Sequence, residues 1–198
     1  NKPIPSDTTV TSRVFSDMND YSWAVTAVDY LYNKKIINGV SDDEFSPEAA
    51  VTREQFVKRV ILALSEVNEA ALADFSDVTR ESWAYPYVAT AYEFGIINGV
   101  SQDKFGFGEK ITREDMAVIL CRALKVFGYT LEEKRENKEF YDIYDASDYA
   151  KTYIARLYTS SIINGVDGDK FLPKGTATRA QAAQIIYNAV TAIGGSNV

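Results

Sequence analysis

The stretch Ile36-Ile37-Asn38-Gly39-Val40 decides the fold, because the chain contains it three times. The same five letters return at residues 96–100 and 162–166, so the copies begin 60 and 66 residues apart. Self-similarity at a spacing of tens of residues is the signature of a repeat architecture. The sequence therefore predicts three copies of one structural unit, which overrides the one or two domains that 198 residues would otherwise suggest.

Other residues keep a fixed distance from this stretch in every copy. A large aromatic residue lies thirteen positions before the first Ile, a Phe lies nine positions after it, and a Thr-Arg pair lies sixteen positions after it. The aromatic residues are Trp23, Trp83 and Tyr149, the Phe residues are Phe45, Phe105 and Phe171, and the pairs are Thr52-Arg53, Thr112-Arg113 and Thr178-Arg179. Four marks in one order, repeated three times, are far more specific than any single mark.

The repeats divide the chain into five predicted parts. These are a linker at 1–12, a first repeat at 13–73, a second at 74–138 with a charged insertion at 128–139, a third at 139–192, and a tail at 193–198. The ends are rich in small polar residues, Pro or Gly and are typical of linkers. We expect a monomeric module fused to a larger protein, with the insertion exposed to solvent. No start Met or leader is present, so any signal peptide is expected to lie outside this sequence.

Composition and charge exclude several classes of protein. A net charge of −7 disfavours nucleic acid and anionic membrane surfaces as partners, because binding to phosphates depends on many Lys and Arg contacts. No run approaches the roughly 18 apolar residues of a membrane span, so we expect no membrane insertion. The chain has no His and only one Cys, Cys121, which removes Ser-His and Cys-His nucleophiles and His-containing zinc sites.

Acidic clusters do not point to catalysis or metal binding either. The loop Asp42-Asp43-Glu44 has no equivalent carboxylate pair in the other repeats, as a repeated glycosidase site would need. Asp167-Gly168-Asp169 hints at calcium, but the twelfth position of that loop is Thr178 and not the glutamate of an EF-hand. We therefore expect no enzyme, no cofactor and no metal site.

Each repeat is predicted to open with an amphipathic helix. Ser22, Ser82 and Asp148 are good N-cap types and stand one residue before the aromatic residue. Apolar residues then recur with helical spacing. Pro86 lies in the first turn, where a missing N–H costs little. The helix should end near the Ile-Ile-Asn-Gly stretch, whose Gly indicates a positive φ or a close backbone approach.

A second helix is predicted to begin at each Thr-Arg pair. Thr52 with Gln55 and Thr178 with Gln181 fit a capping box, and Asp115 takes the place of Gln in the second repeat. A wide apolar stripe follows, which predicts that these three helices form the centre of an all-α module. The stripe comprises Phe56, Val57, Val60, Ile61 and Leu64; Met116, Ala117, Leu120, Cys121 and Leu124; and Ala182, Ala183, Ile186, Tyr187 and Val190.

The ordered set of marks resembles the S-layer homology repeat over about residues 13–192. The marks are Phe15-Ser16-Asp17, the Trp-Ala helix start, the Ile-Ile-Asn-Gly turn, the Phe-x-Pro loop and the Thr-Arg opening. Two of the copies depart from this pattern. The third copy has Phe140-Tyr141-Asp142 out of register, and Tyr149 in place of Trp, while the second copy has Phe105-Gly106-Phe107 and lacks the loop Pro.

The resemblance implies a fold and a function. The fold is a pseudo-threefold module with a central three-helix bundle and three prongs. The function is non-covalent anchoring of a bacterial surface protein to the extracellular cell wall, through binding of an anionic secondary cell-wall polysaccharide in grooves between repeats. The polymer often bears pyruvylated N-acetylmannosamine. The resemblance implies that Arg53, Arg113 and Arg179 contact the acidic sugar and that Gly39, Gly99 and Gly165 lie where the ligand approaches.

The three arginines also stand out on physical grounds. A cation in the first turn opposes the helix dipole, at a cost of roughly 0.3–1 kcal/mol. An arginine there three times over suggests a role beyond local stability. Together with free helix N–H groups and the hydroxyls of Thr52, Thr112 and Thr178, each Arg would make a receptor for a carboxylate such as that of a pyruvate ketal. Replacing an Arg is expected to leave the fold intact.

Structural interpretations of the same residues stay open. Each Arg could pair with a nearby carboxylate and only fasten a loop, and each Gly could serve conformation alone. The threonines could only cap helices, and Trp23, Trp83 and Tyr149 could pack instead of stacking on sugar. Among whole functions, a helical-repeat module that binds proteins and a glycoside hydrolase are the alternatives. The second copy, which lacks the loop Pro, is predicted to form the weakest groove.

Overall fold

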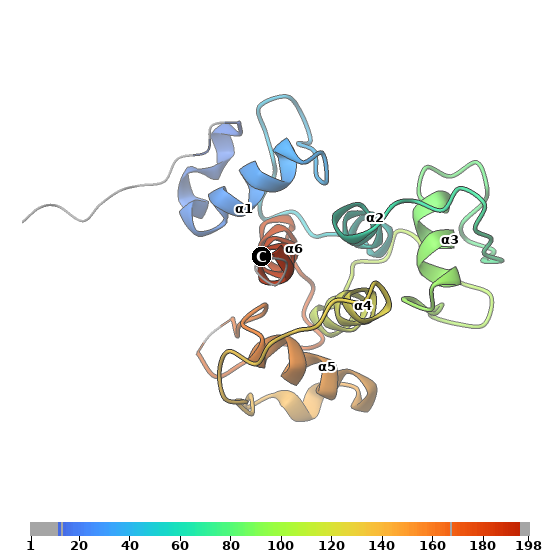
Figure 1. The fold of residues 1–198 in the computed structure, drawn as a ribbon. Coiled ribbons are helices and arrows are strands. Elements are labelled where there is room, and N and C mark those ends of the chain that lie inside the picture. The colour runs from blue at the N-terminus through green and yellow to red at the C-terminus, as the bar shows by residue number, and fades with distance from the viewer. Residues whose placement is uncertain (1–11, 13, 167, 195–198) are drawn as a thin grey trace, which may run out of the picture.

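The computed structural model describes residues 12, 14–166 and 168–194 (Figure 1). Within these ranges it contains six α-helices, two short 3-10 helices and no β-strand, so the all-α class is confirmed. The elements are η1 (Ser16–Tyr21), α1 (Ser22–Asn33), α2 (Arg53–Leu64), α3 (Tyr85–Glu93), α4 (Arg113–Val126), η2 (Ile143–Asp145), α5 (Asp148–Thr159) and α6 (Arg179–Gly194). Asp167, nearly all of the predicted linker 1–12 and most of the tail 193–198 lie outside the described residues.

The second helices of the repeats lie at the centre. Figure 1 shows α2, α4 and α6 nearly end-on around the middle of the molecule, with α1, α3 and α5 outside them. The outer helix α3 packs on α2, α5 packs on α4, and α1 packs on α6. Each first helix therefore rests on the second helix of another repeat. The repeats depend on one another, and their threefold relation stays a prediction.

A closed ring of backbone hydrogen bonds joins the segments that lead into the central helices. Val51 N donates to Ala177 O at 3.1 Å, Ala177 N donates to Ile111 O at 3.4 Å, and Ile111 N donates to Val51 O at 3.0 Å. Each of these residues is almost fully buried. Because buried backbone groups must be paired, the loss of one repeat would leave the other two with unpaired groups.

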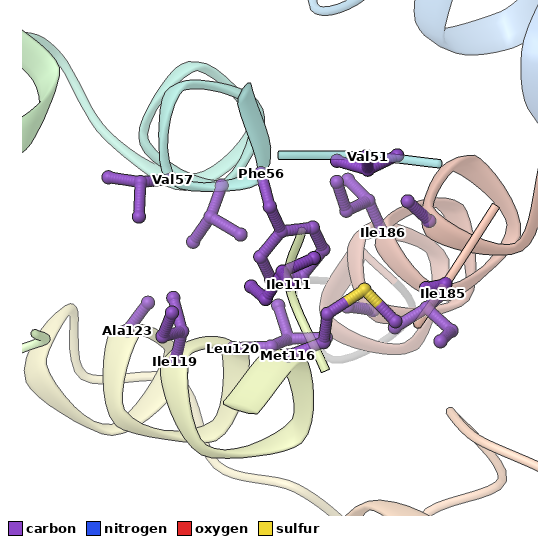
Figure 2. Close-up of a cluster of buried hydrophobic side chains, with 14 of the residues drawn as sticks. Val51, Phe56, Val57, Ile111, Met116, Ile119, Leu120, Ala123, Ile185 and Ile186 are labelled. Atoms are coloured by element: carbon purple, nitrogen blue, oxygen red, sulfur yellow. The ribbon is translucent and has the colours of Figure 1, made fainter. Parts of the chain in front are cut away.

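The core between the central helices is apolar and continuous (Figure 2). Phe56, Met116, Leu120 and Ile186 point into it and are at most 1% exposed. A buried side chain of this size contributes roughly 1.5–3 kcal/mol to stability. At the end of the predicted stripes Leu64 and Leu124 are buried and Val190 is half-buried, while Cys121 is also partly buried against the core.

The predicted N-caps of the first helices are wrong. Ser22 and Asp148 are already the first residues of α1 and α5, and Ser82 lies before α3, which begins at Tyr85. The reason in the first repeat is η1, which runs directly into α1 and leaves Ser22 with a helical backbone at φ −50° and ψ −31°. Pro86 does lie in the first turn of α3, as predicted.

The start of each prong is fixed by an aspartate. Asp17 accepts hydrogen bonds from Phe45 N at 2.9 Å and Ser46 N at 2.7 Å. The corresponding bonds in the third repeat run from Phe171 N and Leu172 N to Asp142, both at 2.8 Å. The out-of-register Phe140-Tyr141-Asp142 therefore occupies the same structural place as Phe15-Ser16-Asp17.

The charged insertion at 128–139 is only partly a solvent-exposed loop. Its acidic residues are exposed as expected, but Leu131 is buried. Arg135 lies over the Tyr158 ring with 3.6 Å to its centroid, and its Nη2 donates to Ile163 O. The insertion is thus fastened to the back of the third repeat's turn.

Candidate functional site

Three grooves lie between neighbouring repeats and are built from equivalent parts. Each contains the Ile-Ile-Asn-Gly turn and central helix of one repeat, the aromatic residue of the next, and the Thr-Arg arginine of the remaining one. Groove 1 is lined by residues 36–39, Gln55, Lys58, Arg59, Trp83 and Arg179. Groove 2 is lined by residues 96–100, Arg53, Asp115, Val118, Ile119, Arg122 and Tyr149. Groove 3 is lined by Trp23, Arg113, Ile162, residues 164–166, Gln181, Gln184, Ile185 and Asn188.

The grooves are open and of modest size. Their volumes are about 240, 540 and 330 Å³ for grooves 1, 2 and 3. Ligand sites for small molecules span roughly 300–1,000 Å³. Grooves 2 and 3 lie within this range and groove 1 lies just below it, so each has the size of a small-ligand site and not of the long trough that a partner helix needs.

The arginine of groove 1 is held by the backbone of another repeat. Arg179 Nε donates to Phe45 O at 2.7 Å and its Nη2 donates to Asn38 O at 2.8 Å, while the guanidinium lies 4.4 Å from the Phe45 ring centroid. In groove 3 the same contacts are made by Arg113 with Phe171 O at 2.7 Å, Asn164 O at 3.2 Å and the Phe171 ring at 4.7 Å. Each of these two arginines therefore fastens a loop and a turn, which argues against the expectation that its loss would leave the fold intact.

One end of these two guanidinium groups is free for a ligand. Arg113 and Arg179 are 6% and 8% exposed, and no described residue accepts a hydrogen bond from the Nη1 of either. Burial lowers the pKa of both, to about 10 for Arg113, which therefore stays charged at neutral pH. Hydrogen bonds from a desolvated cation to an anion are among the strongest available to a protein.

The helix N-termini do not form the rest of an anion receptor. The N–H groups of Arg53, Arg113 and Arg179 donate to Glu109 O, Gly175 O and Ala49 O, each at 2.9 Å. Thr52, Thr112 and Thr178 do not line the grooves. They cap helices, as in the bond from Gln181 N to Thr178 Oγ1 at 3.2 Å. The N–H groups of these three arginines are therefore not free, and a role of the Thr hydroxyls in ligand binding stays a prediction.

Groove 2 carries its own carboxylate. Arg53 Nη1 donates to Asp115 Oδ2 at 3.2 Å, and Tyr149 Oη donates to Asp115 Oδ1 at 3.0 Å. Burial and the nearby Asp115 raise the pKa of Tyr149. Arg53 Nη2 keeps its bond to Asn98 O, but its Nε is buried without a partner among the described residues. Of the three arginines, Arg53 alone follows the ion-pair interpretation.

The aromatic residues face solvent in the grooves. Trp83, Trp23 and Tyr149 line grooves 1, 3 and 2 and are 50%, 53% and 54% exposed. Each ring therefore presents about half of its surface to solvent beside the arginine of its groove. Their exposure beside a cation favours stacking on a sugar ring, one of the two interpretations left open by the sequence.

The turn glycines have a structural reason that also shapes the grooves. The backbone with positive φ is at Lys35, Gly95 and Ser161, each four residues before its turn glycine. A Cβ on Gly39 would lie 2.6 Å from the Phe15 ring and 2.7 Å from Glu44 O. Close approach is therefore the cause. Gly39, Gly99 and Gly165 line their grooves, and a role in ligand approach stays a prediction.

Sequence reasoning missed Arg59 in groove 1. It stands on α2 where the other central helices have Ile119 and Ile185, and it is 6% exposed. No hydrogen-bond or ion-pair partner for it lies among the described residues. Burial and the neighbouring Arg179 lower its pKa to about 9. The available signal was an arginine that interrupts an otherwise apolar column of the aligned repeats.

The described residues contain neither a metal-binding cluster nor a membrane-spanning helix. In residues 12, 14–166 and 168–194 no three metal-ligating side chains gather at one place. Over the same residues, no helix combines the length and apolar character needed to cross a bilayer.

Comparison with known proteins gives one family. The model of the S-layer homology domain matches residues 14–57, 74–117 and 139–183. Similar proteins include Exoglucanase XynX of Acetivibrio thermocellus, 36% identical over 92% of this chain, and the Surface-layer 125 kDa protein of Lysinibacillus sphaericus, 26% identical over 88%. S-layer protein EA1 of Bacillus anthracis is 28% identical over 92%. The matches span only 17%, 15% and 21% of those three proteins.

Proposed function

The chain belongs to the S-layer homology family, and we propose that it binds an anionic secondary cell-wall polysaccharide through grooves 1 and 3. The family is a non-catalytic module that anchors proteins at the bacterial cell surface, so the chain acts outside the cell at the wall. We further propose that the polymer carries an acidic sugar of the pyruvylated kind and that the anchored cargo is a larger surface protein.

The observation that carries this proposal is the pairing of a free guanidinium edge with an exposed indole. Groove 1 has the uncommitted Nη1 of Arg179 and the half-exposed Trp83, and groove 3 has Arg113 and Trp23. A pyruvate ketal supplies one carboxylate on a pyranose ring. The carboxylate can accept from the guanidinium while the ring stacks on the indole, and neither contact needs a chemical step.

Turnover is not expected in any groove. Hydrolysis of a glycosidic bond generally uses two carboxyl groups that flank it. Among the residues that the structure describes, no Asp or Glu lines grooves 1 and 3, and the single one in groove 2, Asp115, is engaged with Arg53 and Tyr149. The glycosidase names of some relatives describe proteins of which this chain matches only a small share.

Co-sedimentation with purified cell-wall sacculi tests the proposal. The chain should pellet with intact sacculi and stay in solution after mild acid has stripped the secondary polymer. The double variant Trp23→Ala, Trp83→Ala should lose at least about tenfold in affinity, as aromatic anchors do when truncated. Tyr141→Ala, which removes an aromatic residue 80% exposed and outside the grooves, is the control. Equal pelleting with stripped sacculi would contradict the proposal.

A further inference from the structure

Groove 1 holds more positive charge than the other two grooves. Its lining, among the residues that the structure describes, contains three cations, Lys58, Arg59 and Arg179, and no carboxylate. Groove 3 contains Arg113 alone, and groove 2 offsets two arginines with Asp115. The excess in groove 1 comes from α2, since the residues equivalent to Lys58 and Arg59 are uncharged in α4 and α6.

Arg59 is a buried cation without a counter-ion. An uncompensated charge removed from water is strongly destabilising, and buried charges in proteins are normally paired. Here the nearest charged group that acts on the Arg59 guanidinium is another guanidinium, that of Arg179, and the two repel. Ile119 and Ile185 occupy the equivalent buried position in the other two repeats. Packing therefore does not require the charge.

The remaining cation of the groove is also placed for a ligand. Lys58 Nζ lies 5.3 Å from the centroid of the exposed Trp83 ring and 5.2 Å from that of Tyr87. No described carboxylate forms an ion pair with Lys58. The indole that a sugar would cover is thus bordered by an ammonium group, and Arg59 and Arg179 line the same groove.

We propose that Arg59, with Lys58, forms a second anion subsite in groove 1, so that this groove selects a saccharide segment with two negative charges and groove 3 a segment with one. The inference rests on the proposed function and adds the ligand's charge. One anionic group is held by the free edge of Arg179. The second neutralises Arg59, and both guanidinium groups are then paired within a single bound ligand.

The two tryptophans allow each groove to be read separately. Trp83 lines groove 1, Trp23 lines groove 3, and the chain has no other tryptophan, so two indole N–H signals in a nitrogen–proton correlation spectrum report the two grooves. The probes are a wall disaccharide with one pyruvate ketal and the same disaccharide with two. In the wild type, the Trp83 signal should report at least about tenfold tighter binding of the doubly charged probe. The Trp23 signal should report similar affinities for both.

Two matched variants test the residue. Arg59→Ile installs the residue of the other repeats and should abolish the preference in groove 1 while leaving the singly charged probe within about threefold. Ile185→Arg places the charge at the same position of groove 3 and should create the preference there. The inference is overturned if groove 1 of Arg59→Ile still prefers the doubly charged probe, or if groove 1 of the wild type shows no such preference. Either result leaves the proposed function standing. If neither probe moves either indole, both fail.

Discussion

Grooves 1 and 2 are assembled from the same parts and differ in whether their arginine is free. In groove 1 the third residue of the central helix is Gln55, and Arg179 Nη1 has no described partner. In groove 2 the same position is Asp115, which forms an ion pair with Arg53 at 3.2 Å. The repeated motif therefore fixes where the cation lies, and the residue two positions after the arginine of the groove's own central helix decides whether that cation is paired within the chain.

The loops beside the arginines follow the same contrast. In the first and third repeats the carbonyl oxygen of the loop Pro accepts a hydrogen bond from the N–H of a central helix. Pro47 O, for example, accepts from Ala180 N at 3.0 Å. In the second repeat Gly108 N donates instead to the Glu54 side chain at 3.0 Å. Beside this altered loop the Arg53 guanidinium lies 5.3 Å from the Phe105 centroid, against 4.4 Å for Arg179 over its phenylalanine. The statement that the second copy forms the weakest groove stays a prediction, since its loop lies beside Arg53 whereas its own arginine, Arg113, lines groove 3.

The largest expected effect concerns what the grooves share. Leu120→Ala empties a fully buried site in the common core and should cost about 2–5 kcal/mol in the free energy of unfolding. Because the backbone ring ties all repeats together, the variant should still unfold in one transition. Urea denaturation followed by both far-ultraviolet circular dichroism and tryptophan fluorescence measures this. Leu72→Ala, at a site 60% exposed, is the control. Two separate transitions would show that the repeats fold independently.

The next prediction concerns a variant in which a new carboxylate pairs with the free arginine of groove 3. Gln181→Asp in groove 3 reproduces Asp115 and should engage Arg113, which would weaken binding of the pyruvylated disaccharide there by roughly 10–100-fold, or about 1.5–3 kcal/mol. The Trp23 indole signal reads groove 3 and the Trp83 signal serves as an internal reference. Gln181→Asn shortens the side chain without charge and should have little effect. If the Asn and Asp variants bind the disaccharide equally well, the negative charge of the Asp is not what weakens binding.

A smaller effect separates groove 1 from the others in the absence of ligand. Arg59→Ile replaces an unpaired buried charge with the hydrophobic residue of the equivalent positions and should raise the free energy of unfolding by about 1–3 kcal/mol. Chemical denaturation of the ligand-free protein measures the gain. Arg122→Met in groove 2 is the control, because Arg122 contacts Tyr153 and is only half-buried. Loss of stability in Arg59→Ile would mean that Arg59 supports the fold.

The smallest effect is an acid sensitivity of the second repeat's loop. Burial alone would raise the pKa of Asp77, but backbone N–H donors from residues 105–107 outweigh it, and the pKa is lowered. The carboxylate therefore stabilises the fold above its unfolded pKa of about 3.9, and the contribution is lost as the pH falls through the lower native value. The difference in urea midpoint between wild type and Asp77→Asn should shrink below about pH 4. A constant difference would contradict this.

The sequence alone predicted the helices, the central position of three of them, and the arginines, glycines and aromatic residues that line the grooves. It could not show that each arginine fastens loops of a different repeat, because those contacts exist only once the repeats are stacked. Asp142 is out of register with Asp17 in the sequence. Only its hydrogen bonds from Phe171 N and Leu172 N show that it takes the same structural place. Arg59 was missed because the overall apolar character of the stripe hid one exceptional column.

Counting the occupied grooves tests the central claim most directly. A pyruvylated disaccharide is titrated calorimetrically into the wild type and into Asp115→Gln, which restores the residue type of Gln55 and Gln181 and releases Arg53. The account predicts two sites per chain in the wild type and three in the variant, with the added site removed by Arg53→Lys and the disaccharide lacking pyruvate binding weakly to both proteins. Three equal sites in the wild type, or two in Asp115→Gln, would contradict it.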